Sequence, residues 1–421
     1  MFLKKNFISY KIAQKYLFQL LVLLTPTQLA YHFWPVQSFI RGARVDYLSP
    51  TFYLTDLIII LILGLWFLYE IRNKLSTGFN PKILFVLLFV LLNIIFAVSP
   101  VIAAFKWVKL VMFFLIAFYI TRQKNFETTG WFVKPLIISL ILVVLIGAGQ
   151  FILRKSLGGP FYFLGERNFT INTSGISLVY LFGENYLRAY SVFSHPNSLA
   201  GYLLVSSILI LINTKRLLYS KQLKNTVVLF ASIGLVLTFS KTAFITLFFL
   251  ALGFFTFQKK LIRKKYLSLL FILFSTLSLF LPAISRFLLT RYSFPKSIYE
   301  RLVLADISGM VISENPVIGV GLNNFFLEIP KYAYKYLGFW VVQPVHNIYL
   351  LVTSETGILG LIIFVLGVSV CLTNSLKNNK TEVAFALFAI GLTGMADHYW
   401  LTLQQNQLLF SYILGIALRK K

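Results

Sequence analysis

The sequence predicts an all-α polytopic membrane protein with about 12 transmembrane helices. The first observation is composition: of 421 residues, 58% are hydrophobic and only 12% are charged, whereas soluble globular domains carry about 25% charged residues. The second is the recurrence of apolar segments of bilayer-spanning length, about 20 residues each. The third is the uneven distribution of Lys and Arg between those segments. This composition excludes a soluble enzyme, a disordered protein and a secreted disulfide scaffold, and Cys371 has no cysteine to pair with.

Apolar segments divide the chain into expected spans of similar length. They lie at 16–36, 51–69, 83–98, 101–120, 132–153, 194–213, 225–239, 242–258, 265–283, 347–370, 381–396 and 400–418. The N-terminal segment does not show a short apolar region followed by a small-residue cleavage site, so we interpret it as an uncleaved first span. The chain is expected to be a single integral membrane domain, 1–421.

The basic residues orient these spans. With the N-terminus inside, short inside segments contain 24 of the 39 Lys and Arg residues, and outside segments contain 13. This bias predicts that both termini are cytoplasmic. The formal net charge of +26 therefore reports topology and contact with anionic lipid, and we expect no nucleic-acid binding.

Two long loops are expected on the external face, at 154–193 and 284–346, and long loops are often functional. The second loop precedes the tenth span and is expected to contain an amphipathic helix between Pro295 and Pro316. Apolar residues recur there at helical spacing: Ile298, Leu302, Val303, Ile307, Met310 and Val311. We expect this helix to lie along the outer membrane face.

A first candidate site is at the start of the sixth span, where Arg188 precedes His195, Pro196 and Asn197. Proline is compatible with the first turn of a helix. An arginine just outside the helix can bind phosphate through two parallel hydrogen bonds. The alternative is an interfacial arginine that extends its charge toward water beside an ordinary helix start.

A second candidate site is at the start of the tenth span, where His346 is followed by Asn347, Tyr349 and Glu355. Histidine titrates near neutrality and can accept a proton from an attacking hydroxyl. A carboxylate deep in a span is costly and indicates function. The alternative is a histidine that only bonds its loop, with Glu355 paired to a neighbouring helix.

Lys106 and Lys109 lie three residues apart on one face of the fourth span. Two ammonium groups in a bilayer require an anion or a water-filled cavity, and a phosphate-bearing lipid would fit. The alternative is that Lys106 alone extends its ammonium group to the membrane interface. Lys109 is harder to explain in this way.

The remaining charged residues give weaker indications. Arg301, beside Glu300 on the amphipathic helix, fits an ordinary surface helix. Adjacent residues on a helix do not share a face, so Asp397 and His398 are expected to make structural hydrogen bonds. Asp46 and Asp56 are too sparse for a metal site.

The chain contains no P-loop, no glycine-rich dinucleotide turn and no H-E-x-x-H sequence, so ATP-driven transport by this chain alone is not expected. We expect no cofactor and no metal.

The order of these features resembles the bacterial O-antigen ligase and O-antigen polymerase superfamily. The shared elements are Arg-x-x-x-x-Phe-x-x-Pro-Asn at 188–197, Ser-Lys at 240–241, Arg301, Asn-Pro-x-x-Gly-x-Gly at 315–321, and His-Asn-x-Tyr at 346–349 followed by Glu355. Two departures are Ser191, where the family usually has glycine, and Lys241, which replaces arginine and loses its two-pronged hydrogen bonding.

The resemblance implies a GT-C-like membrane glycosyltransferase, at the external face of the bacterial cytoplasmic membrane, that acts in cell-envelope polysaccharide biosynthesis. It would transfer a glycan from an undecaprenyl-diphosphate carrier to a hydroxyl of a glycan, lipid or protein acceptor. His346 would act as base, and Arg188 and Arg301 would bind the pyrophosphate. Their positions near the outer face make Lys106, Lys109 and Lys241 further anion-binding candidates, and we expect supporting roles for Asn197, Asn347, Tyr349 and Glu355.

Three hypotheses follow for function. The favoured one is this metal-independent transferase, as a ligase, a polymerase or a protein O-oligosaccharyltransferase of the same superfamily. The second is a transporter or flippase of lipid-linked glycans, against which the long asymmetric loops and the lack of two matching halves argue. The third is an assembly protein without chemistry, which leaves Lys109 and Glu355 unexplained.

Overall fold

The computed structural model describes residues 2–72, 83–123, 126–213, 221–258, 265–336 and 343–419. Its first half contains helices α1 (Phe2–Leu23), α2 (Leu54–Arg72), α3 (Ile83–Ile95), α4 (Pro100–Arg122), α5 (Lys134–Leu153), α6 (Pro196–Asn213) and α7 (Lys221–Thr238). Its second half contains α8 (Lys241–Gln258), α9 (Lys265–Ser278), α10 (Leu281–Leu289), α11 (Lys296–Glu314), α12 (Phe325–Ala333), α13 (Ile348–Lys377), α14 (Thr381–Gly394), α15 (Tyr399–Thr402) and α16 (Gln404–Leu418).

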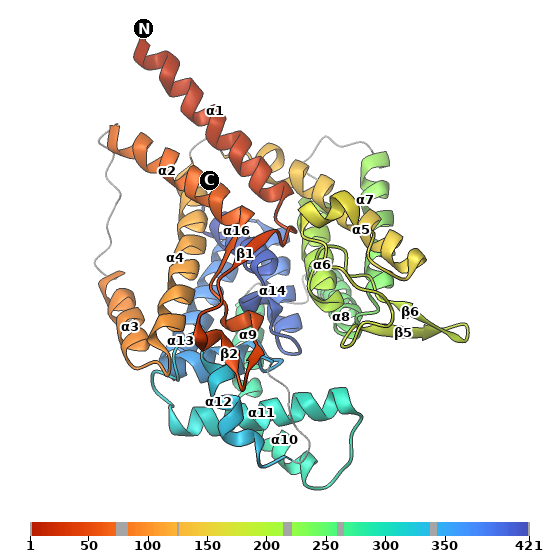
Figure 1. Cartoon of the computed structure of the whole chain (residues 1–421). Coiled ribbons are helices and arrows are strands. Elements are labelled where there is room, and N and C mark those ends of the chain that lie inside the picture. Colours follow the sequence, from red (N-terminus) through yellow and green to blue (C-terminus); the bar gives the residue numbers. More distant parts are fainter. Residues whose placement is uncertain are drawn as a thin grey trace.

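Strands are few and short, and they form three antiparallel pairs within the described residues. The strands are β1 (Ala30–His32), β2 (Phe39–Ile40), β3 (Ala43–Arg44), β4 (Thr51–Tyr53), β5 (Leu178–Leu181) and β6 (Glu184–Leu187). β1 pairs with β4, with Ala30 opposite Tyr53, and β5 pairs with β6 as a hairpin that projects to the right in Figure 1.

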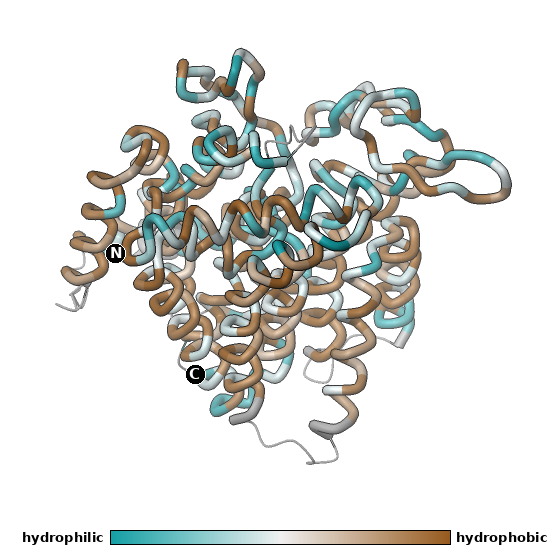
Figure 2. The backbone as a smooth tube through the Cα atoms, turned by 90° about the horizontal axis from the view of Figure 1, so that it is seen from below, coloured by the Kyte–Doolittle hydropathy of each residue, from teal (hydrophilic) through white to brown (hydrophobic). Residues whose placement is uncertain are grey.

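The mostly helical class of the protein is confirmed and its apolar helices are consistent with a membrane protein, whereas the number of twelve spans is not confirmed. In the described residues, five stretches are long and apolar enough to cross a bilayer. They are Leu54–Arg72, Pro100–Arg122, Thr129–Leu153, Leu267–Leu289 and Ile348–Lys377. Five shorter apolar helices accompany them, at Leu84–Ile95, Pro196–Ile212, Gln222–Thr238, Lys241–Phe255 and Thr381–Gly394. In Figure 2 hydrophobic segments dominate the helices, and hydrophilic segments gather along the upper edge of the view.

Two expected spans differ from the structure at their ends. The first, at 16–36, is wrong in its second half: α1 ends at Leu23, Pro26 follows in the turn, and residues 30–32 form β1. Proline cannot continue a helix because it lacks the N–H group. The last, at 400–418, is interrupted at Leu403, whose backbone is extended between α15 and α16. Several expected cytoplasmic loops, at 73–82, 214–220 and 259–264, and the C-terminal Lys420 and Lys421 lie outside the described residues.

The expected amphipathic helix is confirmed as α11, which lies beside α10 at the bottom of Figure 1. Its apolar face is covered by protein, because Val303, Ile307 and Val311 are buried in one cluster with residues of α12 and α13. The expectation that this face rests on the membrane is therefore wrong for these residues. The other expected external loop, 154–193, contains the β5–β6 hairpin.

A glycine-rich turn at 316–321 fixes the start of α13. The helix breaks at Gly357, where φ is +65° and ψ is −173°. The turn inserts at this break: Val320 N donates to Ser354 O (3.0 Å), Gly321 N to Glu355 O (3.0 Å), and Ile358 N to Pro316 O (2.8 Å). The backbones meet so closely that a Cβ on Gly357 would lie 2.1 Å from Val317 O. This contact positions the first turns of α13, which begin beside His346.

Candidate functional site

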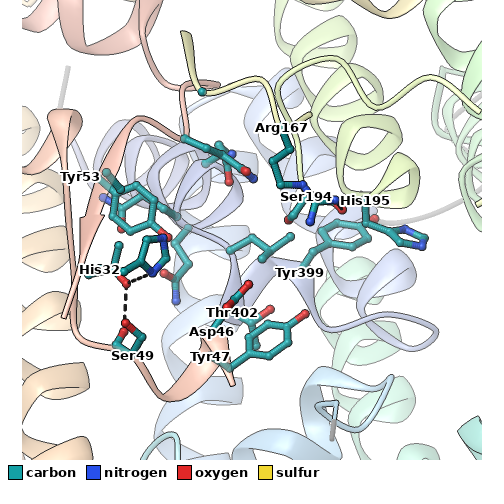
Figure 3. A pocket seen from close by; sticks show the side chains of 18 of the residues that line it. His32, Asp46, Tyr47, Ser49, Tyr53, Arg167, Ser194, His195, Tyr399 and Thr402 are labelled. Carbon is teal, nitrogen blue, oxygen red and sulfur yellow. Dashed lines mark hydrogen bonds between the residues drawn. The ribbon is translucent and has the colours of Figure 1, made fainter. Parts of the chain in front are cut away.

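A polar cavity of about 690 Å³ is the strongest candidate for a functional site. Its walls come from parts of the chain far apart in sequence: residues 28–53, the start of α4, residues 162–168, 190–195 and 343–346, and residues 397–407. Figure 3 shows His32, Ser49 and Tyr53 on one side and Arg167, Ser194 and His195 on the other. Hydroxyls, amides, imidazoles, carboxylates and cationic groups all line it.

His346 lines this cavity and is fixed by the helix that follows it. The side chain of Asn347 caps α13 by accepting hydrogen bonds from Tyr349 N (2.9 Å) and Leu350 N (3.0 Å). The imidazole ring of His346 lies 5.2 Å from the ring of His398, centroid to centroid. Its Nδ1 atom is buried and has no hydrogen-bond partner among the described residues. A buried nitrogen without a partner is costly, so its presence beside the cavity argues against a purely structural role for His346.

Asp397 and His398 belong to the break between α14 and α15, and they lie beside His346. Asp397 Oδ2 accepts a hydrogen bond from Asn197 Nδ2 (2.9 Å), and His398 Nδ1 is 2.8 Å from Thr402 Oγ1. One ligand atom from each of His346, Asp397 and His398 lies within 4.8 Å of the others. Asp397 and His398 were expected to make structural hydrogen bonds only, but both also line the cavity.

The donor set of two imidazoles and one carboxylate could bind a divalent transition metal. Two arginines oppose that use. The charge of Arg301 acts on all three groups, and Arg188 is bonded to the same asparagine as Asp397. The cluster is thus already supplied with positive charge, and the expectation of a metal-free site stays a prediction.

The two predicted pyrophosphate-binding arginines stand behind this cluster. Arg188 donates to Thr238 O (2.7 Å) and to Asn197 Oδ1 (2.8 Å), so Asn197 bridges Arg188 and Asp397. Arg301 donates from Nη1 to Ala396 O (2.8 Å). Neither is among the described residues that line the cavity, whereas Arg167 is. The structure therefore brings both arginines to the site, next to its carboxylate.

Burial dominates the electrostatics of the histidines. It lowers the pKa of His346 to about 3, assisted by His398 and Arg301 and opposed by Asp397. It lowers the pKa of His195 and of His398 to about 4. Burial alone would raise the pKa of Asp397, but the surrounding imidazoles and Arg301 outweigh it and hold that pKa below its ordinary value. At neutral pH the site therefore contains neutral histidines and an ionised carboxylate.

These histidines predict a pH-dependent stability. The unfolded chain binds protons at these three histidines below the ordinary pKa of 6.5, whereas the folded chain does not until about pH 4 or lower. The free energy of unfolding is therefore expected to fall as the pH drops from about 6.5 to about 4. Thermal unfolding in detergent across this range measures the effect. His398→Phe should lower the number of protons taken up on unfolding by about one, so that the free energy of unfolding falls less steeply with decreasing pH. An unchanged slope would contradict the assignment.

Lys106 and Lys109 both line the cavity from α4, as their shared helical face predicts. Lys109 forms an ion pair with Asp56 and lies over the ring of Tyr53, 5.0 Å from its centroid. Asp56 also accepts hydrogen bonds from Tyr53 N (2.8 Å) and Gln404 Nε2 (2.7 Å). The anion that Lys109 requires is thus Asp56 of this chain. Lys106 is therefore the better candidate for binding a negatively charged group of a ligand.

Breaking this buried pair is expected to destabilise the protein. Asp56→Asn would leave Lys109 charged without its counter-ion, at a cost of about 3 kcal/mol. Lys109→Met would leave the carboxylate without its cation. The double variant removes both charges, so we expect it to lose less than the sum of the single variants. Thermal unfolding of the four proteins in detergent measures the coupling, and additive losses would contradict it.

The other predicted site residues lie away from the cavity wall. Glu355 is buried and interacts with Lys106 and with the backbone of the turn after Gly321. Tyr349 is buried, and its hydroxyl donates to Gly391 O (3.1 Å). Asn347 is a helix cap, as described above. Lys241 is exposed at the start of α8. These positions favour supporting roles for the first three.

Sequence reasoning missed several residues that line the cavity: Arg167, Tyr190, Ser194, Tyr47, Asp397 and His398. One signal was available for the last two, because an Asp-His pair between two apolar segments interrupts a helical pattern. Arg167 lies in a long loop without a recurring pattern, and the sequence gives no signal for it.

The fold and the site together define a multi-pass helical membrane protein with a partly open, histidine-containing cavity lined by both polar and apolar groups. Residues 226–365, from α7 into α13, match the family model described as O-antigen ligase, Wzy_C. This match supports membership of the O-antigen ligase and polymerase superfamily, and with it a membrane enzyme of the glycosyltransferase type. The matched range includes Lys241, Arg301, His346 and Glu355. No curated protein matches the chain.

Proposed function

We propose that the protein transfers a glycan from an undecaprenyl-diphosphate carrier to an acceptor hydroxyl, with His346 as the general base. The observation that carries the proposal is that His346 lines the cavity, is neutral at pH 7, and has no hydrogen-bond partner at its buried Nδ1 among the described residues. A neutral imidazole with an unpaired nitrogen is the form that can accept a proton. The family match supports the class of reaction.

The proposed step is a displacement at the anomeric carbon of the donor sugar. The acceptor hydroxyl passes its proton to His346 as its oxygen attacks that carbon. The bond between the carbon and the diphosphate oxygen breaks, and the electron pair leaves with undecaprenyl diphosphate. The diphosphate would also raise the pKa of His346 toward neutrality once bound, because a nearby negative charge favours the imidazolium.

Cationic side chains around the cavity would neutralise the leaving group. Lys106 and Arg167 line the cavity itself. Arg188 and Arg301 lie behind the cavity wall, where their positive charges act on the carboxylate of Asp397. We assign Arg188 and Arg301 to pyrophosphate binding once the donor enters. Lys109, which is already paired with Asp56, and Lys241, which is exposed away from the cavity wall, are secondary candidates. The reaction as proposed uses these side chains in place of a metal.

The proposal places the chain in the bacterial cytoplasmic membrane, with both termini in the cytoplasm and the cavity open to the external face. The basic residues of the short loops support this orientation. The acceptor is a glycan, a lipid or a protein, and each corresponds to one member of the superfamily: a polymerase, a ligase or a protein O-oligosaccharyltransferase.

The glycans of a strain that lacks this chain test the proposal. Loss of long chains on the carrier itself indicates a polymerase, and accumulation of full-length carrier-linked chains indicates a ligase. Complementation by the wild-type chain should restore the glycans, and complementation by His346→Ala should not. Carrier-linked glycan that accumulates only at the cytoplasmic face would contradict the proposal and indicate a flippase.

A further inference from the structure

We propose that the cavity contains a saccharide subsite, formed by residues 28–53, that hydrogen-bonds the hydroxyl groups of the glycan. The subsite consists of His32, Asp46, Tyr47 and Tyr53, all of which line the cavity. We refer to residues 28–53 as the N-terminal arm. This inference rests on the proposed function, and it names the part of the chain that recognises the sugar.

The N-terminal arm is ordered by its own hydrogen bonds. β1 and β4 pair so that His32 faces Thr51, and His32 Nδ1 lies 3.0 Å from Thr51 Oγ1. Thr51 Oγ1 donates its hydrogen to Ser49 O (3.0 Å), as Figure 3 shows, so it accepts from His32 Nδ1. The Nε2 atom of His32 has no hydrogen-bond partner among the described residues and can bond a ligand hydroxyl. A preformed group on a rigid hairpin costs little ordering when a ligand binds.

Asp46 and Tyr47 present unused hydrogen-bonding groups to the cavity. The carboxylate of Asp46 has no hydrogen-bond partner among the described residues, and its side chain is exposed at the cavity wall. The ring of Tyr47 is held between Phe326, stacked at 5.0 Å, and His398, edge-on at 5.8 Å. Burial and the nearby Asp397 raise the pKa of Tyr47, so its hydroxyl stays protonated and can donate.

The groups along the arm suit a polyhydroxylated ligand. His32 and Tyr53 lie across the cavity from Arg167 and His195, and Asp46 and Tyr47 lie between them (Figure 3). The carboxylate of Asp46 repels a diphosphate, which is attracted instead to Lys106 and Arg167 at the cavity wall. A polyhydroxylated, uncharged group fits the arm, because carboxylate, phenol and imidazole groups together both accept and donate hydrogen bonds.

The position of Tyr47 connects the arm to the reaction. Its ring contacts His398, and His398 lies beside His346. A sugar bound on the arm would therefore lie next to the proposed base, whether it belongs to the donor or to the acceptor. Both sources present the same hydroxyl chemistry, and the two can be separated experimentally.

Binding by the full-length chain in lipid nanodiscs tests the subsite. The probes are bare undecaprenyl diphosphate and undecaprenyl diphosphate with its native oligosaccharide, extracted from cells that lack this chain. The variants are Asp46→Ala and Tyr47→Phe, the second of which removes only a hydroxyl. The matched control is Tyr180→Phe, because Tyr180 is 70% exposed on the β5–β6 hairpin outside the cavity. Thermal unfolding verifies that each variant folds.

We expect Tyr47→Phe to weaken binding of the carrier-linked oligosaccharide about fivefold and Asp46→Ala about tenfold or more, with bare carrier affected less than twofold. If the sugar belongs to the acceptor, the same losses should be found in KM for the acceptor during transfer. Unchanged values in both assays would overturn the subsite. Failure of the wild-type chain to bind bare carrier would instead contradict the proposed function, so the two failures are distinguishable.

Discussion

Replacement of His346 by alanine is expected to lower the rate of glycan transfer by at least about a hundredfold, because loss of a positioned general base removes this much. The fold should persist, since His346 Nδ1 makes no hydrogen bond to the described residues. The rate is measured with purified chain, carrier-linked glycan and acceptor. Thermal unfolding in detergent reports the fold.

The control for this variant is Lys296→Ala, because Lys296 has a side chain that is 90% exposed on α11. It should transfer glycan at the wild-type rate. His346→Ala with near-wild-type transfer would remove His346 from the mechanism. A His346→Ala protein that does not fold would show that the imidazole is structural, which also contradicts the assignment.

Replacement of Gly357 by alanine is expected to destabilise the protein by about 3 kcal/mol. Two causes combine: φ is +65° at this residue, where a side chain is strained, and the new Cβ would lie 2.1 Å from Val317 O. The turn at 316–321 would be displaced from α13, and activity should fall with it because α13 positions His346. Thermal unfolding and transfer rate measure the two effects.

Gly367→Ala is the matched control on the same helix, because a Cβ there meets nothing within 4 Å. Alanine is the better helix former, so this variant should be as stable as the wild type or slightly more stable. Equal stability of the Gly357 and Gly367 variants would show that the docked turn contributes little.

The helices were largely predictable because apolar segments of sufficient length indicate spans directly. α4, α6, α8 and α14 begin within a few residues of their expected positions. What the pattern does not encode is where a helix breaks. The interruption at Leu403 and the strand at 30–32 depend on contacts with distant parts of the chain, so the expected ends of the first and last spans were wrong.

The candidate site was predictable only where a residue stands at the start of a helix, as His346 and Arg188 do. The assembly around them joins residues that are far apart in the sequence. Asp397 was set aside because neighbouring helical residues do not share a face, yet it lies in a break between helices, where that rule does not apply. The partner of Lys109 is Asp56, 53 residues away, and no local spacing indicates such a pair.

The central claim is that this chain makes a glycosidic bond in the cavity that contains His346. The direct measurement is to incubate the purified chain in nanodiscs with carrier-linked glycan and acceptor, without nucleotide or added metal, and to quantify the products. We predict new glycosidic linkages and free undecaprenyl diphosphate in equal amounts. Carrier-linked glycan that remains intact, and that crosses the bilayer when the chain is placed in liposomes, would contradict the claim and identify a transporter.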